Sequence, residues 1–230
     1  MARLYLFAEG QTEQTFADTL LKPHLAKVGV YLHAVILIAH AKRKGIVHRG
    51  GCRKYAPMKN DIRRFLAQEK AGDVFFTTMI DLYAIHTEFP GLDEAEKLRH
   101  SPDKRVEALE RAFAEDIDDL RFVPYIQLHE YETYLFSDPT QFGFFYDHHE
   151  KAISALKAIA DGYTTPELID DGLSSAPSKR IIAELPDYEG AKSVVGPWVA
   201  ERIGLDMIRG KCPHFGAWLS RLEQLGIETH

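Results

Sequence analysis

Four runs of apolar residues are spaced along the first 130 positions, and they predict four buried strands. The runs cover residues 4–8, 30–39, 74–80 and 122–128, and they are short and rich in β-branched or aromatic side chains. The segments between them carry apolar positions at helical spacing. Thr12 is placed to cap a first helix, whose later turns Pro23 should perturb, and further helices are expected over 58–68 and 103–116. Residues 87–101 contain Pro90 and Gly91 and are expected to form a loop.

After the fourth apolar run the pattern becomes helical. Helices are expected over residues 132–136, 148–160, 177–184, 191–203 and 213–225, and Trp198, Phe215 and Trp218 fall at core spacing within them. Strands that alternate with helices predict an α/β fold with a mostly parallel central sheet flanked by helices. We therefore expect an α/β core over residues 1–137 and a helical C-terminal part, packed on that core, over residues 138–230.

Composition narrows the class of protein. The 230 residues are 45% hydrophobic and 27% charged, as in an ordinary globular protein. No apolar run approaches the roughly 20 residues that span a bilayer, and no charged-then-apolar leader precedes the first strand, so a cytoplasmic location with no membrane partner is expected. Cys52 and Cys212 lie 160 positions apart without a CxxC pair, which favours two reduced thiols over a zinc site or a disulfide.

Charge is segregated along the chain. The net charge of −6 argues against indiscriminate nucleic-acid binding, yet residues 41–64 hold nine Lys/Arg and one Asp, whereas residues 93–121 hold ten Asp/Glu. A basic run is usually a solvated face of a protein. This one is interrupted by glycines and follows a strand, so it also suits a cationic loop that contacts phosphates through Lys42, Arg43, Lys44 and Arg49.

Acidic residues stand where three of the four predicted strands end. Glu9, Asp81 and Glu130 follow the first, third and fourth strands, and Glu132 lies close behind. The carboxyl ends of parallel strands share one edge, so these acids are expected to meet in one crevice. Carboxylates that repel each other are the ligands of a hard cation such as Mg²⁺ or Mn²⁺, and such a site can activate water beside a phosphodiester. The alternative for any single acid is a helix cap or a solvated turn residue, and His129 is expected to be a packed histidine.

Motifs for other chemistries are missing from the sequence. There is no G-x-x-x-x-G-K-[ST] loop, no G-x-G-x-x-G after a strand and no G-x-S-x-G elbow. Any nucleotide-driven work must therefore be done by a separate protein.

Three segments carry a family resemblance. "FAEGQTE" at 7–13, "TTMIDLY" at 77–83 and "HEYETYLF" at 129–136 resemble the signature of a bacterial Toprim-like family of unknown function. That family is related to the nuclease half of OLD proteins and to RloB-type proteins. Its members are often encoded beside an ABC- or AAA-type ATPase in phage-defence operons. The similarity runs through nearly the whole chain, including "PSKRI" at 177–181 and "CPHFGAWLSRL" at 212–222.

The resemblance implies a Toprim-like nuclease subunit that uses Mg²⁺ or Mn²⁺ to cleave DNA or RNA, with an ATPase as partner. Asp81 would be a direct metal ligand and Glu9 a ligand or general base. The Toprim pattern has Asp-x-Asp after a later strand, but Tyr83 replaces the second aspartate here, so Glu130 or Glu132 would complete the site. The family pattern adds phosphate contacts from three further residues, Lys179, Arg180 and Lys192. The missing aspartate leaves open a non-catalytic Toprim-shaped module that binds or regulates the ATPase.

Overall fold

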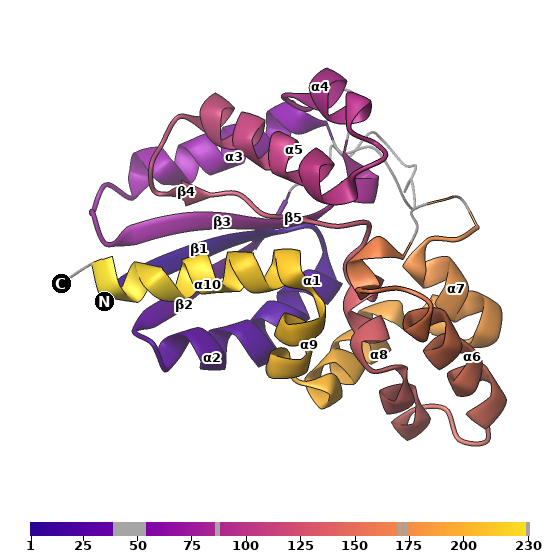
Figure 1. Ribbon diagram of the computed structural model, residues 1–230. Coiled ribbons are helices and arrows are strands. Elements are labelled where there is room, and N and C mark those ends of the chain that lie inside the picture. The colour runs from indigo at the N-terminus through magenta and orange to yellow at the C-terminus, as the bar shows by residue number, and fades with distance from the viewer. Residues whose placement is uncertain (39–53, 86–87, 170–171, 173, 229–230) are drawn as a thin grey trace, which may run out of the picture.

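A parallel sheet forms the centre of the protein (Figure 1). The computed structural model describes residues 1–38, 54–85, 88–169, 172 and 174–228. Strands β1 (Ala2–Ala8), β2 (Val30–Leu37), β3 (Val74–Asp81) and β4 (Phe122–Val123) lie in the order β2-β1-β3-β4, and β5 (Ile126–Gln127) pairs with β3. Every pairing among them is parallel. The protein is therefore α/β with a parallel central sheet flanked by helices, as the apolar pattern predicts.

The fourth predicted strand is broken into two short pieces, which corrects the expectation of one strand over 122–128. Pro124 separates β4 from β5, and proline has no backbone N–H to donate to a sheet ladder. The side chain of Thr78 bridges the gap, because its Oγ1 accepts from Tyr125 N and donates to Tyr125 O, both at 2.9 Å. Thr77 Oγ1 likewise donates to Val123 O at 2.6 Å. Side chains of β3 thus replace the missing ladder bonds.

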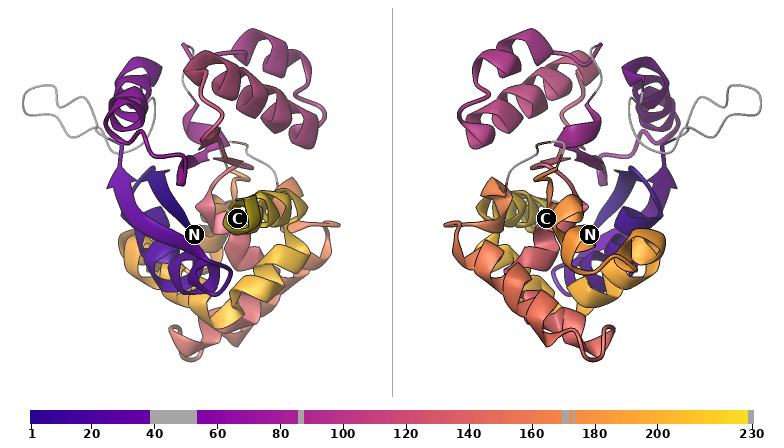
Figure 2. Two further views of the ribbon diagram at one scale, coloured as in Figure 1. Left: turned by 90° about the vertical axis from the view of Figure 1, so that its left-hand side faces the viewer. Right: turned by 90° about the vertical axis from the view of Figure 1, so that its right-hand side faces the viewer.

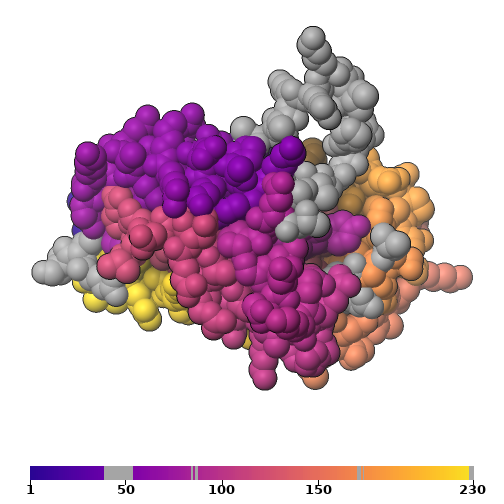
Figure 3. All heavy atoms as spheres, turned by 90° about the horizontal axis from the view of Figure 1, so that it is seen from above, coloured from indigo at the N-terminus to yellow at the C-terminus, as the bar shows by residue number. Residues whose placement is uncertain are grey.

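One face of the sheet is covered by α3 (Tyr55–Gln68) and α5 (Pro102–Ile117), which lie above it in Figure 1. Both helices place apolar residues at helical spacing on the sheet, for example Ile62 of α3 and Phe113 of α5, which are fully buried with Phe76 of β3. In the sequence, α4 (Leu92–Lys97) lies between these two helices. It is a short helix inside the segment predicted as a loop. It begins after Gly91, whose positive φ of 75° allows the tight entry. Figure 3 shows this layer from above, with α3 in purple and α4–α5 in magenta.

The first helical segment lies on the opposite face. It runs through α1 (Gln11–Phe16), a π-helical turn η1 (Ala17–Leu21) and α2 (Lys22–Ala26). Pro23 cannot donate to the preceding turn and would clash with a regular α-helical carbonyl, so a widened π turn precedes it. The predicted Thr12 cap is wrong, because the N-cap residue is Gly10, in an extended conformation.

The chain after β5 is helical, as predicted, and most of it lies beyond the carboxyl ends of the strands (Figures 1 and 2). The prediction that Trp198 lies in the core is wrong, because this residue is 48% exposed. Phe215 and Trp218 are buried, as predicted. No helix within the described ranges has both the length and the apolar content to cross a membrane. Three of the elements were not predicted: η4 (Pro139–Phe144), η5 (Pro166–Leu168) and α9 (Leu205–Lys211). In order the elements are η3 (Tyr131–Ser137), η4 (Pro139–Phe144), α6 (Glu150–Asp161), η5 (Pro166–Leu168), α7 (Pro177–Glu184), α8 (Tyr188–Ile203), α9 (Leu205–Lys211) and α10 (Pro213–Glu228).

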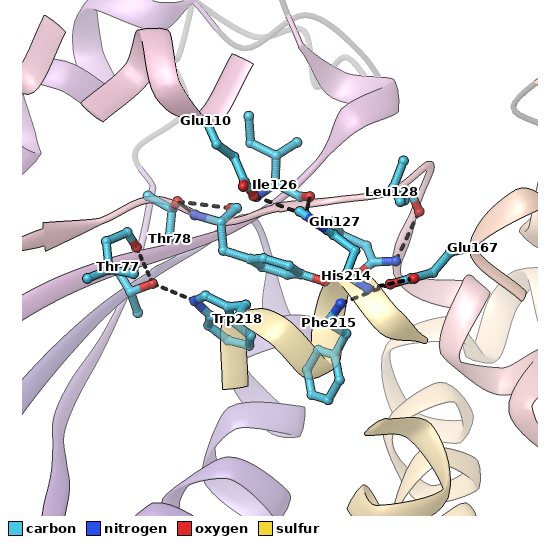
Figure 4. Close-up of polar contacts among 12 residues, drawn as sticks. Thr77, Thr78, Glu110, Ile126, Gln127, Leu128, Glu167, His214, Phe215 and Trp218 are labelled. Carbon is cyan, nitrogen blue, oxygen red and sulfur yellow. Dashed lines mark hydrogen bonds and ion pairs between the residues drawn. The ribbon is translucent and has the colours of Figure 1, made fainter. Parts of the chain in front are cut away.

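Helix α10 returns to the sheet and is fixed there by buried polar contacts (Figure 4). Trp218 Nε1 donates to Thr77 Oγ1 at 2.9 Å. His214 Nε2 lies 3.1 Å from Glu110 Oε1 of α5, and the two oxygens of Glu167 accept from His214 N and Phe215 N at 2.9 and 3.0 Å. Glu167 therefore caps the N-terminus of α10. These contacts hold the last helix against the same sheet that positions the strand-end acids.

Candidate functional site

Glu9 and Asp81 lie together where β1 and β3 end. Ala8 pairs with Met79 in the parallel register, and Glu9 N donates to Met79 O at 3.0 Å, which extends the ladder by one residue. The Glu9 carboxylate crosses to the neighbouring strand, where Oε2 accepts from Asp81 N at 2.9 Å. The structure therefore brings these two strand-end acids to one sheet edge.

Glu13 is a further acid in this site, and the strand-end argument missed it. It lies in the first turn of α1, is 5% exposed, and its Oε2 accepts from Gly10 N at 2.7 Å. Burial and the negative charge of Glu9 raise the pKa of Glu13 from an ordinary 4.5 to about 7. The sequence signal was present, since a glutamate three residues after a helix start is the second half of a capping box.

The carboxyl group of Asp81 also has a raised pKa. Burial raises its pKa well above the ordinary value, and the negative charges of Glu9 and Glu13 raise it further. Its Oδ1 atom is buried and has no hydrogen-bond partner in the part of the chain that the structure describes. A buried acceptor without a partner is uncommon in folded proteins and calls for an explanation such as an ion or a ligand.

A left-handed turn brings the predicted third acid to the same edge. His129 has a φ of 64°, and its carbonyl accepts from Tyr83 N at 3.0 Å, which ties the end of β5 to the segment after β3. The His129 ring is buried, in agreement with a packed histidine. Glu130 follows, and its negative charge contributes to the raised pKa of Asp81. Glu130 Oε1 also accepts from Ser178 N in the first turn of α7, so Glu130 serves this helix as well.

Glu132 is buried beside Lys192, which the sequence predicts to bind phosphate. Burial, and then the charge of Glu130, raises the pKa of Glu132 to about 7, while Lys192 opposes the shift. Lys192 Nζ lies 3.5 Å from Glu132 Oε1, and Tyr188 OH lies at the same distance from that oxygen. Lys192 therefore partly neutralises the acidic cluster formed by Glu9, Glu13, Asp81, Glu130 and Glu132.

Lys179 and Arg180, the other predicted cationic residues within the described ranges, make no ion pair with this cluster. Arg180 is engaged locally, since its Nε donates to Ser175 O at 2.7 Å and its guanidinium donates to Tyr163 OH at 3.1 Å. Lys179 is exposed in the first turn of α7. The basic loop residues Lys42, Arg43, Lys44 and Arg49 lie outside the described residues.

The donor chemistry of the acidic cluster fits a hard divalent cation. All five groups offer carboxylate oxygens, which Mg²⁺ and Mn²⁺ prefer, and Asp81 Oδ1 is a buried acceptor with no donor among the described residues. Within the described ranges, however, no three His, Cys, Asp or Glu side chains already surround a common point as in a loaded metal site. Tyr83 is 52% exposed and supplies no carboxylate next to Asp81. A cation would thus have to draw the carboxylates together.

Comparison with known proteins places the chain in a family. The model of the domain of unknown function DUF4276 matches residues 8–223. Among solved structures, the C-terminal region of the Burkholderia pseudomallei OLD protein is similar over 100% of this chain and 98% of that chain, with a TM-score of 0.47 and 13% sequence identity. None of the curated proteins compared is a match. Because the family model spans nearly all of the sequence, including both strand-end acids, the chain belongs to the DUF4276 family.

Proposed function

We propose that this protein is a Toprim-like nuclease subunit that depends on Mg²⁺ or Mn²⁺ and hydrolyses phosphodiester bonds of nucleic acids. The observation that carries the proposal is the pairing of Glu9 with Asp81 across β1 and β3, with Asp81 Oδ1 buried and without a hydrogen-bond partner among the described residues. Parallel strands gather such groups at their carboxyl edge, which is where α/β proteins bind ligands.

We assign roles to the acids of the cluster. A bound divalent cation would supply an activated water and neutralise charge on the phosphate. Asp81 and Glu9 would be its ligands, Glu9 would also serve as general base, and Glu13, Glu130 or Glu132 would complete the set. The Asp81 amide fixes one oxygen of Glu9, so the Glu9 carboxylate is oriented before any substrate arrives.

Cationic side chains are assigned to the substrate backbone. Lys192, which lies 3.5 Å from Glu132, is a cation that faces the cluster and is placed to contact a phosphate next to it. Lys179, Arg180 and the basic residues Lys42, Arg43, Lys44 and Arg49 are proposed to contact phosphates of DNA or RNA farther along the strand. These contacts carry no base specificity.

The motif resemblance extends the proposal to partners and context. From this resemblance we infer a role in phage defence together with an ABC- or AAA-type ATPase encoded nearby. The sequence lacks a phosphate-binding loop of its own, so the ATPase would be a separate protein. We also propose the division into an α/β core over 1–137 and a helical part over 138–230, which contributes Lys192 to the site.

A second function is favoured by two observations. Position 83 holds an exposed tyrosine in place of the second Toprim aspartate, and no three metal-binding side chains are preassembled within the described residues. A non-catalytic Toprim-shaped module that binds or regulates the ATPase accounts for both facts.

Cleavage assays separate the two functions. Plasmid DNA, single-stranded DNA and RNA are incubated with the protein in Mn²⁺, in Mg²⁺ or in EDTA, with and without the ATPase. The nuclease proposal predicts cleavage that needs the metal and is lost in Asp81→Asn. Glu94→Gln is the matched control, because Glu94 is exposed on α4, where it pairs with Lys97. Absence of cleavage under all conditions would leave the regulatory module as the better account. Equal cleavage by Asp81→Asn would mean that the acidic cluster is not the site of cleavage.

A further inference from the structure

Glu110 and His214 lie at the free edge of the sheet, beside β5. Strand β5 pairs with β3 on one side, and within the described ranges no strand pairs with its other side. Ile126 N donates to Glu110 Oε1 at 2.8 Å, and Ile126 O lies 3.1 Å from His214 Nε2. The two side chains therefore bond the backbone groups that a neighbouring strand would otherwise bond.

The same pair connects helices from the two faces of the sheet. His214 Nε2 lies 3.1 Å from Glu110 Oε1. Figure 4 shows Glu110 reaching β5 from above and His214 reaching it from the start of α10 below. Phe113 of α5 belongs to the hydrophobic core on one face, whereas Trp218 of α10 belongs to the core on the other. Contact between Glu110 and His214 thus joins the two layers around the edge of the sheet.

The hydrogen-bond geometry determines which nitrogen of His214 carries a hydrogen atom in the neutral ring. Both atoms that lie 3.1 Å from Nε2, Glu110 Oε1 and Ile126 O, are acceptors, so Nε2 is the donor. A second proton, on Nδ1, makes the ring an imidazolium and turns the contact with Glu110 into an ion pair. Tyr125 stacks on the His214 ring at 5.1 Å between centroids, and an aromatic face favours the cationic form.

The surroundings of His214 stabilise the protonated ring. Within the described residues, the charged groups that act on it are Glu110 of α5 and Glu167 of η5. Tyr125 is the other titratable group that faces the ring, and it is neutral because burial raises its pKa well above the ordinary value. Burial alone lowers the pKa of His214, but the hydrogen bond to Glu110 and the charges of the two glutamates outweigh burial and raise this pKa above 6.5.

We propose that Glu110 and His214 form a proton-dependent latch: with His214 protonated, the ion pair holds the start of α10 and the backbone of β5 to α5, and loss of the proton loosens both. Folding raises the pKa of His214, so the stability that the latch contributes is complete below pH 6.5 and is lost as pH rises through the pKa of the folded protein. The segment after β5 carries Glu130, so the latch also affects how firmly the chain before this acid is held. The inference does not depend on the proposed function.

Hydrogen exchange measured by mass spectrometry tests the latch in EDTA, without metal or substrate. Protection factors, corrected for the intrinsic exchange rate at each pH, are compared at about pH 6 and about pH 9, on either side of the histidine titration. Peptides that cover residues 124–128 and 213–218 report on the latch, and a peptide from β1 reports on global opening. Relative to β1, opening of both segments in the wild type should increase roughly fivefold at the higher pH, about the factor that a hydrogen bond gains from a charged partner.

Two variants keep the hydrogen bonds but cannot form the ion pair. Glu110→Gln keeps an acceptor for Ile126 N, and His214→Gln keeps a side-chain N–H for Ile126 O. Neither variant should show the increase in opening with pH. His100→Gln is the matched control, because His100 is exposed, and it should behave as the wild type.

An increase that is absent from the wild type, or that persists in both variants, would overturn the proposal. If His214→Gln does not fold, Glu110→Gln decides the matter, because it leaves the imidazole in place. NMR titration of the ring is a second measurement on the same proteins. The His214 ring should titrate above pH 6.5 in the wild type and at a lower pH in Glu110→Gln, and an unchanged midpoint would likewise overturn the latch.

Discussion

The Glu9 carboxylate accepts a hydrogen bond from the backbone amide of Asp81 at 2.9 Å, across 72 positions of sequence. This contact joins two neighbouring parallel strands, so Glu9 is committed to the sheet edge and not to the helix that follows it. The helix start is served by Glu13, which accepts from Gly10 N–H. A carboxylate stands at the end of β1 because it faces Asp81, and the two acids define the centre of the candidate site.

Replacing Glu9 with glutamine tests its chemical role. Glutamine keeps the size of the side chain and an oxygen that can accept from Asp81 N–H, so we expect the free energy of unfolding to change little. Metal-dependent cleavage should fall by about 10²–10⁴-fold, as for other positioned acid–base groups. Rates measured at saturating Mn²⁺ on the substrate that wild type cleaves give the answer. Full activity in a folded Glu9→Gln protein would rule out a role as ligand or base.

Stability should depend on pH through Glu13. Its pKa rises from 4.5 to about 7 on folding, so the folded protein binds this proton more tightly than the unfolded chain does. The contribution of Glu13 to the free energy of unfolding therefore falls as pH rises from 4.5 to about 7. Glu13→Gln removes this dependence, and its stability relative to wild type should increase across that interval. Urea unfolding in EDTA measures the difference, with Glu94→Gln as the exposed control, and a constant difference would contradict the buried state of Glu13.

Added Mn²⁺ should reverse that trend at the alkaline end. Cations bind deprotonated carboxylates, so binding must displace protons from Asp81, Glu13 and Glu132. We expect the melting temperature to rise on adding Mn²⁺ at about pH 8 and to change little at about pH 5. Differential scanning fluorimetry at both values tests this, and an equal shift at both would place the bound ion elsewhere.

A further prediction concerns the basic residues that lie outside the described ranges. Neutralising Lys42, Arg43, Lys44 and Arg49 together should weaken binding to all nucleic-acid sequences about equally. The plot of log affinity against log salt concentration should also become shallower, by close to one unit for each phosphate that the protein no longer neutralises. Fluorescence anisotropy with several unrelated oligonucleotides measures both effects. An unchanged salt slope would mean that these residues belong to a solvated face or to a surface that binds a partner.

Replacing Gly226 with alanine tests how closely α10 must approach the sheet. A Cβ at this position would lie 2.2 Å from Val28 O, a backbone atom just before β2, so Gly226→Ala should destabilise the protein by about 1–3 kcal/mol. At Gly210 of α9 an added Cβ meets nothing within 4 Å, so Gly210→Ala should stabilise by roughly 0.5–1 kcal/mol. Thermal unfolding of the pair gives the two signs, and two stabilising changes would mean that α10 is not held against Val28.

The sheet and its acidic edge were predictable because local patterns determine them. Short apolar runs rich in β-branched residues identify β1, β2 and β3, and parallel pairing places their ends together. Pro124 in the fourth run indicates a break, but the replacement bonds come from Thr78, 47 positions away from Tyr125. Capping rules favour a side-chain acceptor and therefore predict Thr12 as the cap, whereas Glu13 supplies the acceptor from within the helix.

Contacts between distant segments were not predictable from spacing. His214 lies 104 positions from Glu110, and nothing around either residue indicates that they meet beneath β5. Trp198 has core spacing, but α8 is apolar on both sides, and the side that bears Trp198 faces solvent. The contacts of Glu132 were not predictable either, because Lys192 and Tyr188 come from a helix that begins 56 positions later.

Anomalous diffraction from crystals soaked in MnCl₂ tests the central claim most directly. The account predicts a manganese peak at the carboxyl edge of the sheet, about 2.0–2.6 Å from oxygens of both Glu9 and Asp81. Asp81 Oδ1, which has no hydrogen-bond partner among the described residues, should be one of these oxygens. A fully soaked crystal with no peak beside Glu9 and Asp81, or with carboxyl groups that stay turned away from the ion, would contradict a shared metal site.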